Sequence, residues 1–215
     1  MISPHPRRHS LVLVTTLALA AAAFGAPAFA GHGVERIARA RGEALGSTVT
    51  VRGTVSVPSN AFDAGFAIQD GHAGIYVLDS GGVARTLGAE VEVTGTLVES
   101  FGLLAIQPSA IAARGQGKQV KPHKHRTGSV GEATEGRLLE LHGVQVGDVF
   151  DDGVFGFIVH IDDGSGPIQL FLFPGTGISI DGLVDGASVD VVCFSSQFET
   201  HFECDPRGPA DLEID

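Results

Sequence analysis

A basic stretch near the middle of the chain is the part of the sequence best suited to bind an anion. No acidic residue occurs between Glu99 and Glu132, and this interval contains five cationic side chains: Arg114, Lys118, Lys121, Lys124 and Arg126. Lysine and arginine neutralise phosphates and release their counterions, so such a cluster can hold an anionic polymer. A solvated linker kept soluble by its charge is the competing interpretation.

Metal binding and catalysis have little support in the sequence. His123 and His125 lie in the same stretch, but two histidines without a carboxylate or thiol partner make a weak metal site. The Asp-Gly turns at 151–153 and 162–166 resemble calcium loops superficially, yet Asp-Gly is ordinary hairpin chemistry. The sequence has no nucleophile elbow, phosphate loop or His-Glu-x-x-His motif. We therefore expect a non-enzymatic protein without metal or cofactor.

The chain as a whole is acidic, with a formal net charge of −11 over 215 residues. A surface of this charge repels nucleic acid on average, because phosphate binding depends on lysine and arginine. Any nucleic-acid partner would therefore have to contact a local basic cluster.

The stretch 65–79, read GFAIQDGHAGIYVLD, predicts a β-hairpin. Two alternating runs flank a turn that contains Asp-Gly, and alternation with a period of two is typical of a strand with one buried face. Parity places Phe66, Ile68, Ile75 and Val77 in the core. The opposite parity directs Ala67, Gln69 and Tyr76 to the other face.

A second copy of this unit follows about 90 residues later. The first unit begins with the alternating run 48–57, whose Gly53 is expected to form a bulge, and 137–146 matches it in the second unit. Residues 156–170 repeat the hairpin and 187–194 repeat the fourth strand. A five-stranded sheet with a bent first strand is typical of a small closed Greek-key barrel, so the fold class is all-β with two tandem barrels.

The quoted hairpin, with VRGTVS before it and LGAEVEVTGTL after it, resembles the OB-fold modules of secreted bacterial proteins, including those attached to extracellular nucleases. The resemblance covers 48–112 well and 133–214 loosely, and it implies the fold. No nuclease domain follows in this sequence, so the resemblance implies no catalytic activity.

OB-fold barrels hold single strands with exposed rings on strands two and three and in the neighbouring loops. Tyr76 and Gln69 are expected on that face, Phe62 and Phe101 in the bordering loops, and Arg52 before the bend of the first strand. With the basic stretch they form the predicted nucleic-acid site. Tyr76 would equally be an ordinary exposed tyrosine, and the two phenylalanines would equally close the ends of the barrel.

The second unit presents a different surface. By parity, Ile158, His160, Gln169, Phe171 and Phe173 are expected to point outward, in a region with many aspartates. The last four form a predicted interaction patch. An exposed apolar patch more often meets protein than nucleic acid. We expect it to pack on the first barrel or on a partner protein, with base stacking as the alternative.

Export is predicted from both ends of the sequence. Residues 1–30 have a basic start, an apolar run and a small-x-small signal ending at Ala30, which predicts a cleaved signal peptide and a secreted or periplasmic protein. The apolar run is too short to span a bilayer comfortably, so we expect no stable membrane insertion. Cys193 and Cys204 lie in the last predicted strands and are expected to form a disulfide in an oxidising compartment.

The predicted organisation is a signal peptide over 1–30, an arm or short helix over 31–45, a first barrel over 46–113, a basic linker over 114–132 and a second barrel over 133–215. Glycines and Pro122 favour an extended, mobile linker. The leading hypothesis is binding of single-stranded nucleic acid by the first barrel and the linker. The alternative is a protein- or glycan-binding module of the envelope or the extracellular space, without nucleic-acid affinity.

Overall fold

The computed structural model describes residues 33–62 and 64–215, so the predicted signal peptide lies outside the described residues. The described chain opens with a short helix, α1 (Ile37–Ala40), whose Ile37 and Ala40 are buried against the first barrel. The Asp70 carboxylate accepts a hydrogen bond of 2.8 Å from the Ile37 backbone N–H, which satisfies one unpaired donor at the start of this helix. Within the described part of the chain, no helix is both long and apolar enough to cross a membrane.

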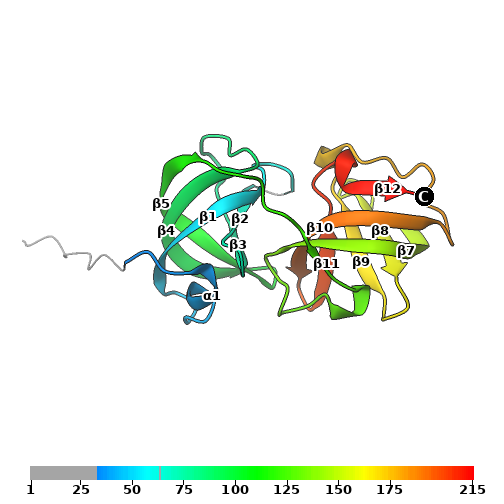
Figure 1. The fold of residues 1–215 in the computed structure, drawn as a ribbon, viewed down its shortest axis with the longest axis horizontal. Helices are drawn as coiled ribbons and strands as arrows, with labels where there is room; N and C mark the ends of the chain where they lie inside the picture. The colour runs from blue at the N-terminus through cyan, green and yellow to red at the C-terminus, as the bar shows by residue number, and fades with distance from the viewer. Residues whose placement is uncertain (1–32, 63) are drawn as a thin grey trace, which may run out of the picture. The chain divides into compact units, whose positions relative to one another are not determined.

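The first barrel consists of β1 (Thr48–Val57), β2 (Phe66–Gln69), β3 (Gly74–Val77), β4 (Ala89–Ser100) and β5 (Leu103–Gln116). These five strands close in the order β1-β2-β3-β5-β4, with the β3–β5 pair parallel and the others antiparallel (Figure 1). This order is that of an OB fold. The four hairpin residues predicted to be internal all belong to its buried core, so the parity of the hairpin is confirmed.

Gly53 does not form the predicted bulge. β1 pairs with β4 without interruption from Thr48 to Thr54, and the irregularity in its pairing with β2 lies between Val55 and Val57. A Cβ atom at Gly53 would approach the Ile68 Cβ to 3.0 Å, so glycine here permits close packing across the barrel. Sequence alone could not separate this cause from a bulge, because both favour glycine in a strand.

The second barrel consists of β7 (Leu138–Asp151), β8 (Phe157–Asp162), β9 (Ile168–Leu172), β10 (Ser188–Phe198) and β11 (His201–Asp205), and the β10–β7 pairing closes it. Two short strands are added to this barrel, β6 (His123–Lys124) and β12 (Leu212–Ile214). Short 3₁₀ turns occur at η1 (Thr127–Ser129), η2 (Pro174–Thr176) and η3 (Pro209–Asp211). The predicted fold class of two closed five-stranded barrels is thus confirmed.

The predicted disulfide is present between Cys193 of β10 and Cys204 of β11. Both sulfurs are buried in the core of the second barrel. The two strands form an antiparallel hairpin, as the spacing of the two cysteines predicts.

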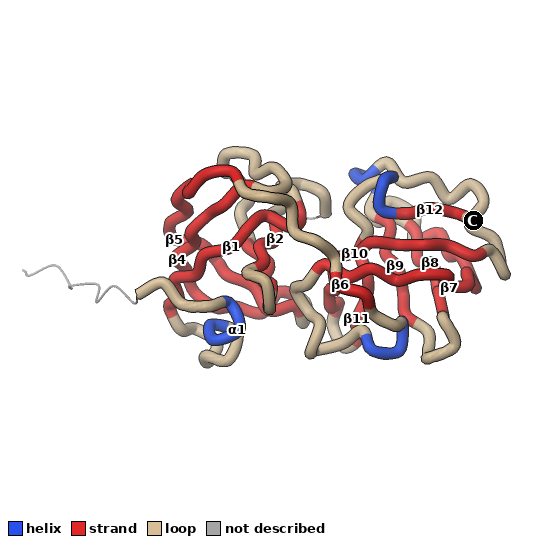
Figure 2. Tube along the Cα trace, in the orientation of Figure 1, coloured by secondary structure: helices blue, strands red, loops and turns tan. Residues whose placement is uncertain are grey.

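The segment between the barrels differs from the predicted mobile linker. β5 extends to Gln116, so Arg114 lies on a strand of the first barrel. Beyond β5, His123 and Lys124 form β6, which pairs in parallel with Leu139 and Glu140 of β7 (Figure 2). We call residues 117–126 the connector, and its second half is held by the sheet of the second barrel.

The described residues form one compact unit, in which the barrels share a third apolar cluster besides the core of each barrel. Phe194 of β10 packs there with residues of the first barrel, namely Val57, Ala61, Ala67, Tyr76, Leu103 and Ala105. Phe194 is fully buried. The contact between the two barrels is therefore a domain interface whose apolar side chains are as buried as those of a protein core.

Candidate nucleic-acid interface

The predicted stacking face of the first barrel is covered. The ring of Tyr76 leaves the barrel core, as parity predicts, but it is only 5% exposed and its centroid lies 6.0 Å from that of Phe194. Gln69 is also buried, and its side-chain oxygen accepts a 3.0 Å hydrogen bond from the Leu138 backbone N–H. The expected exposure of Tyr76 and Gln69 is therefore wrong, because β7 and β10 of the second barrel occupy their surroundings.

The two predicted loop phenylalanines have different surroundings. Phe62 is partly buried, with its ring 5.1 Å from Phe173 and 6.0 Å from Phe194. Phe101 is 69% exposed at the β4–β5 turn and stacks on Phe198 at 5.7 Å. Of the three predicted aromatic contacts, Phe101 alone presents an open ring.

The three predicted site arginines are paired with carboxylates. Arg52 and Arg114 both bind Glu92, at 2.9 and 2.7 Å, and Arg126 lies 3.3 Å from Asp163. The hydrogen bond from Arg114, followed by that from Arg52, lowers the pKa of Glu92 below its ordinary value. These guanidinium groups are already partly neutralised, which reduces their attraction for a phosphate.

The three lysines form no such close ion pair among the described residues, although Lys124 interacts electrostatically with Asp190 at longer range. Lys118, Lys121 and Lys124 are the only lysines in the sequence and all are exposed. None of the ion pairs found among residues 33–62 and 64–215 involves them. We call Lys118, Lys121 and Lys124 the lysine strip.

An open pocket of about 370 Å³ lies beside the lysine strip. Lys118, Lys121 and His123 line one part of it, and Thr54, Gln69, Asp70 and Gly71 contribute from the first barrel. Burial, followed by the charge of Arg137, lowers the pKa of His123 below its ordinary value. His123 is therefore neutral at pH 7, and the lysines supply the positive charge of the pocket.

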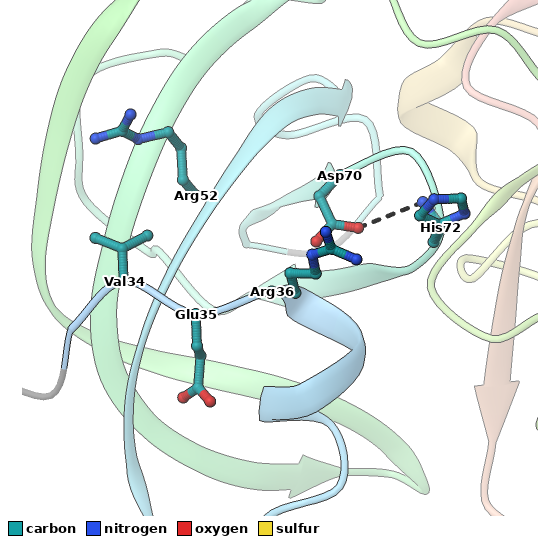
Figure 3. Close-up of a pocket in the computed structure, with 6 residues that line it drawn as sticks. All are labelled: Val34, Glu35, Arg36, Arg52, Asp70 and His72. Carbon is teal, nitrogen blue, oxygen red and sulfur yellow. Dashed lines mark hydrogen bonds between the residues drawn. The ribbon is translucent and has the colours of Figure 1, made fainter.

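A second open pocket, of about 350 Å³, shares Asp70 of the β2–β3 turn with the first (Figure 3). Arg36 and Arg52 line it together with Val34, Glu35, Asp70 and His72. Besides holding α1, Asp70 accepts hydrogen bonds from the backbone N–H groups of Ala73 at 3.2 Å and His72 at 3.4 Å. Asp70 lines both pockets and stiffens the β2–β3 turn. Its Asp-Gly sequence predicts the turn but not the hydrogen bond to α1.

The Asp-Gly turn at 162–166 anchors the end of the connector. Thr127 is buried and donates a 2.9 Å hydrogen bond to the Asp163 carboxylate, which Ser165 also contacts. The Ser165 hydroxyl and then Thr127 hold the pKa of Asp163 well below its ordinary range. In the part of the chain that the structure describes, no three side chains of His, Cys, Asp or Glu gather as a metal site.

The predicted interaction patch of the second barrel is half covered. Phe173 packs on Phe62 of the first barrel, and Phe171 lies edge-on to Phe173 at 4.6 Å. Gln169 donates a 3.1 Å hydrogen bond to Glu203, and His160 is exposed. The patch thus starts at the contact with the first barrel and continues onto open surface.

Comparisons with known proteins give structural likenesses only. No protein-family model matches the chain, and no curated protein matches it in sequence. Among solved structures, a murine DNA-binding protein bound to double-stranded DNA is similar at 10% identity and a TM-score of 0.39, covering 77% of this chain and 97% of that one. The p204 HINb domain is similar at 11% identity and a TM-score of 0.35, covering 79% and 96%. Likenesses of this strength say nothing about what this chain binds.

Proposed function

We propose that this chain is an exported, non-enzymatic protein that binds single-stranded nucleic acid at the lysine strip. The observation that carries the proposal is the position of the lysines. In a chain of net charge −11, all three are exposed on one connector and none belongs to an ion pair of the described residues. A local cluster of unpaired cations is what a phosphate backbone requires.

The proposed contact is mainly with phosphates. The second barrel covers Tyr76, so base stacking on the β2–β3 face is not available. Phe101 is the exposed ring among the three predicted aromatic contacts, but it stacks on Phe198 at the β4–β5 turn and does not line the pocket beside the lysine strip. Binding of this kind is tolerant of sequence and weakens as salt rises.

A titration of a fluorescein-labelled oligothymidylate, followed by anisotropy at several salt concentrations, tests the proposal. Three phosphate contacts predict that the logarithm of affinity falls with the logarithm of salt with a slope of about −2. The double variant Lys118→Gln/Lys121→Gln should reduce the magnitude of this slope by about 1.4. Arg39→Gln removes one charge from an exposed position on α1 that lines neither pocket, and it should leave the slope nearly unchanged.

An equal loss per charge removed in the lysine variant and in Arg39→Gln would mean that the overall charge, and not the lysine strip, governs binding. No binding at low salt would contradict the proposal outright. That result would favour the alternative class, a protein- or glycan-binding module without nucleic-acid affinity.

A further inference from the structure

An apolar row crosses the outer face of the second barrel. Phe150 of β7 pairs with Ile158 of β8, which in turn pairs with Phe171 of β9. Directly paired residues project to the same face of a sheet, and none of the three belongs to the barrel core. Phe150 is 58% exposed, and Ile158 and Phe171 are half-buried.

This row continues the contact between the barrels. From Phe171 the rings follow one another through Phe173 at 4.6 Å, Phe62 at 5.1 Å and Phe194 at 6.0 Å. The inner end of this series is buried between the barrels and the outer end is open. The open row is therefore an extension of an established apolar interface.

The β7–β8 turn adds apolar side chains and negative charge beside the row. Val154 is 85% exposed and Phe155 is 67% exposed. Asp148, Asp151 and Asp152 lie on the same hairpin, and none of them belongs to an ion pair of the described residues. Asp151 pairs with Phe157, which packs on the barrel core, so it projects to the side opposite Phe150. We call the other seven residues the acidic apolar face: Asp148, Phe150, Asp152, Val154, Phe155, Ile158 and Phe171.

We propose that the acidic apolar face binds a cationic, apolar segment of a partner protein. Exposed apolar side chains that lie together mark an interaction surface, because covering them removes apolar area from water. The uncompensated carboxylates attract lysine and arginine and repel phosphates, which disfavours nucleic acid and anionic lipid. Three strands span about 10 Å, which is also the width of a helix, so an amphipathic helix fits across the row.

This inference is independent of the lysine strip. The probe is a labelled helical peptide with lysine on one face and leucine on the other, titrated by anisotropy. Phe150→Ser/Phe171→Ser should weaken its binding about tenfold or more, since a few aromatic residues carry most of the energy of an interface. The matched control Leu45→Ser/Val83→Ser changes two exposed apolar residues of the first barrel and should leave binding unchanged.

The contribution of the carboxylates to peptide binding is tested with the same titration. Asp148→Asn/Asp152→Asn should weaken binding several-fold and reduce its salt dependence. Asp181→Asn/Asp185→Asn removes two charges from exposed positions elsewhere and should have a smaller effect. Far-UV circular dichroism confirms that each variant is folded.

Several results would overturn the proposal. One is that a peptide with glutamate in place of lysine binds as tightly as the lysine–leucine peptide. The others are that the lysine–leucine peptide does not bind, or that it binds Phe150→Ser/Phe171→Ser as tightly as the unchanged protein. A dimer in light scattering that Phe150→Ser/Phe171→Ser dissolves would identify a second copy of the chain as the occupant. Flotation with phosphatidylcholine vesicles that the same variant abolishes would identify a membrane.

Discussion

His142 lies between two carboxylates at the one irregular point in the pairing of β7 with β10. Its Nδ1 is 2.8 Å from Asp190 and its Nε2 is 3.1 Å from Glu140. The neighbouring Gly143 has a φ of +58°, and its N–H donates a 2.7 Å hydrogen bond to Asp190. Asp190 lies opposite this bulge and contacts both of its residues, His142 through the side chain and Gly143 through the backbone N–H.

The hydrogen bond to Asp190 raises the pKa of His142 above its ordinary value of 6.5. A raised pKa in the folded state means that protonation favours folding. This contribution is complete below about pH 6.5 and is lost as the pH rises through the pKa of the folded protein. We predict that Asp190→Asn lowers the pKa of His142 and reduces this loss of stability on raising the pH.

Imidazole proton shifts measured by NMR give the pKa, and urea unfolding at several pH values gives the stability. Asp181→Asn is the control, since Asp181 is exposed and the carboxylates that pair with His142 are those of Glu140 and Asp190. An unchanged titration of His142 in Asp190→Asn would show that the contact does not set its pKa.

At the scale of the element, the connector is held in place by a short strand and an anchored turn. β6 pairs with β7, and Thr127 bonds to Asp163 in the β8–β9 turn. Thr127 also accepts a 3.1 Å hydrogen bond from the Asp163 backbone N–H. One buried hydroxyl thus satisfies groups on a turn 36 residues further along the chain.

Thr127→Val keeps the shape of the side chain and removes this hydroxyl. The unpaired groups should cost about 1–3 kcal/mol locally and release the end of the connector. We predict that trypsin then cleaves after Lys118 and Lys124 several-fold faster than in the unchanged protein, as measured by mass spectrometry of a time course.

Thr200→Val, at an exposed hairpin turn, is the control and should leave the cleavage rate unchanged. Equal rates in Thr127→Val and the unchanged protein would mean that β6 alone holds the connector.

At the scale of the whole molecule, Phe194 joins the two barrels. Besides the apolar cluster, the contact includes a buried ion pair of 2.8 Å between Arg41 and Glu135 and a 2.8 Å hydrogen bond from Arg207 to the Ser56 carbonyl. Burial raises the pKa of Glu135, whereas Arg41 opposes this effect. Polar and apolar contacts together predict that the barrels unfold cooperatively.

Phe194→Ala should lower the free energy of unfolding by about 3–5 kcal/mol, because it leaves a cavity among fully buried side chains. It should also expose Tyr76, which is the only tyrosine in a chain without tryptophan and so reports on this contact alone. We therefore predict stronger acrylamide quenching of the intrinsic fluorescence, together with a lower urea midpoint.

Phe155→Ala is the matched control, since Phe155 is exposed and its loss should change stability by less than about 0.5 kcal/mol. Unchanged quenching in Phe194→Ala would contradict the role given to this ring. Separate transitions by fluorescence and circular dichroism in the unchanged protein would contradict the cooperativity.

The sequence was most informative about local patterns. Alternation identified the internal residues of the β2–β3 hairpin, repetition identified the second barrel, and the spacing of Cys193 and Cys204 identified the disulfide. Each of these three predictions uses only residues that are close in the sequence or that belong to one hairpin. Period-two alternation directly reports which side of a strand is buried, so the fold class followed from it.

What the sequence alone determined is therefore the pair of barrels and the direction in which each hairpin side chain points. Only the tertiary structure decided what each outward side chain meets: Phe194 over Tyr76, and Glu92 between Arg52 and Arg114. Alternation separates the inside of a barrel from its outside, but it carries no information about contacts made by distant segments. For that reason the predicted stacking face became an internal interface, while the lysine strip stayed open.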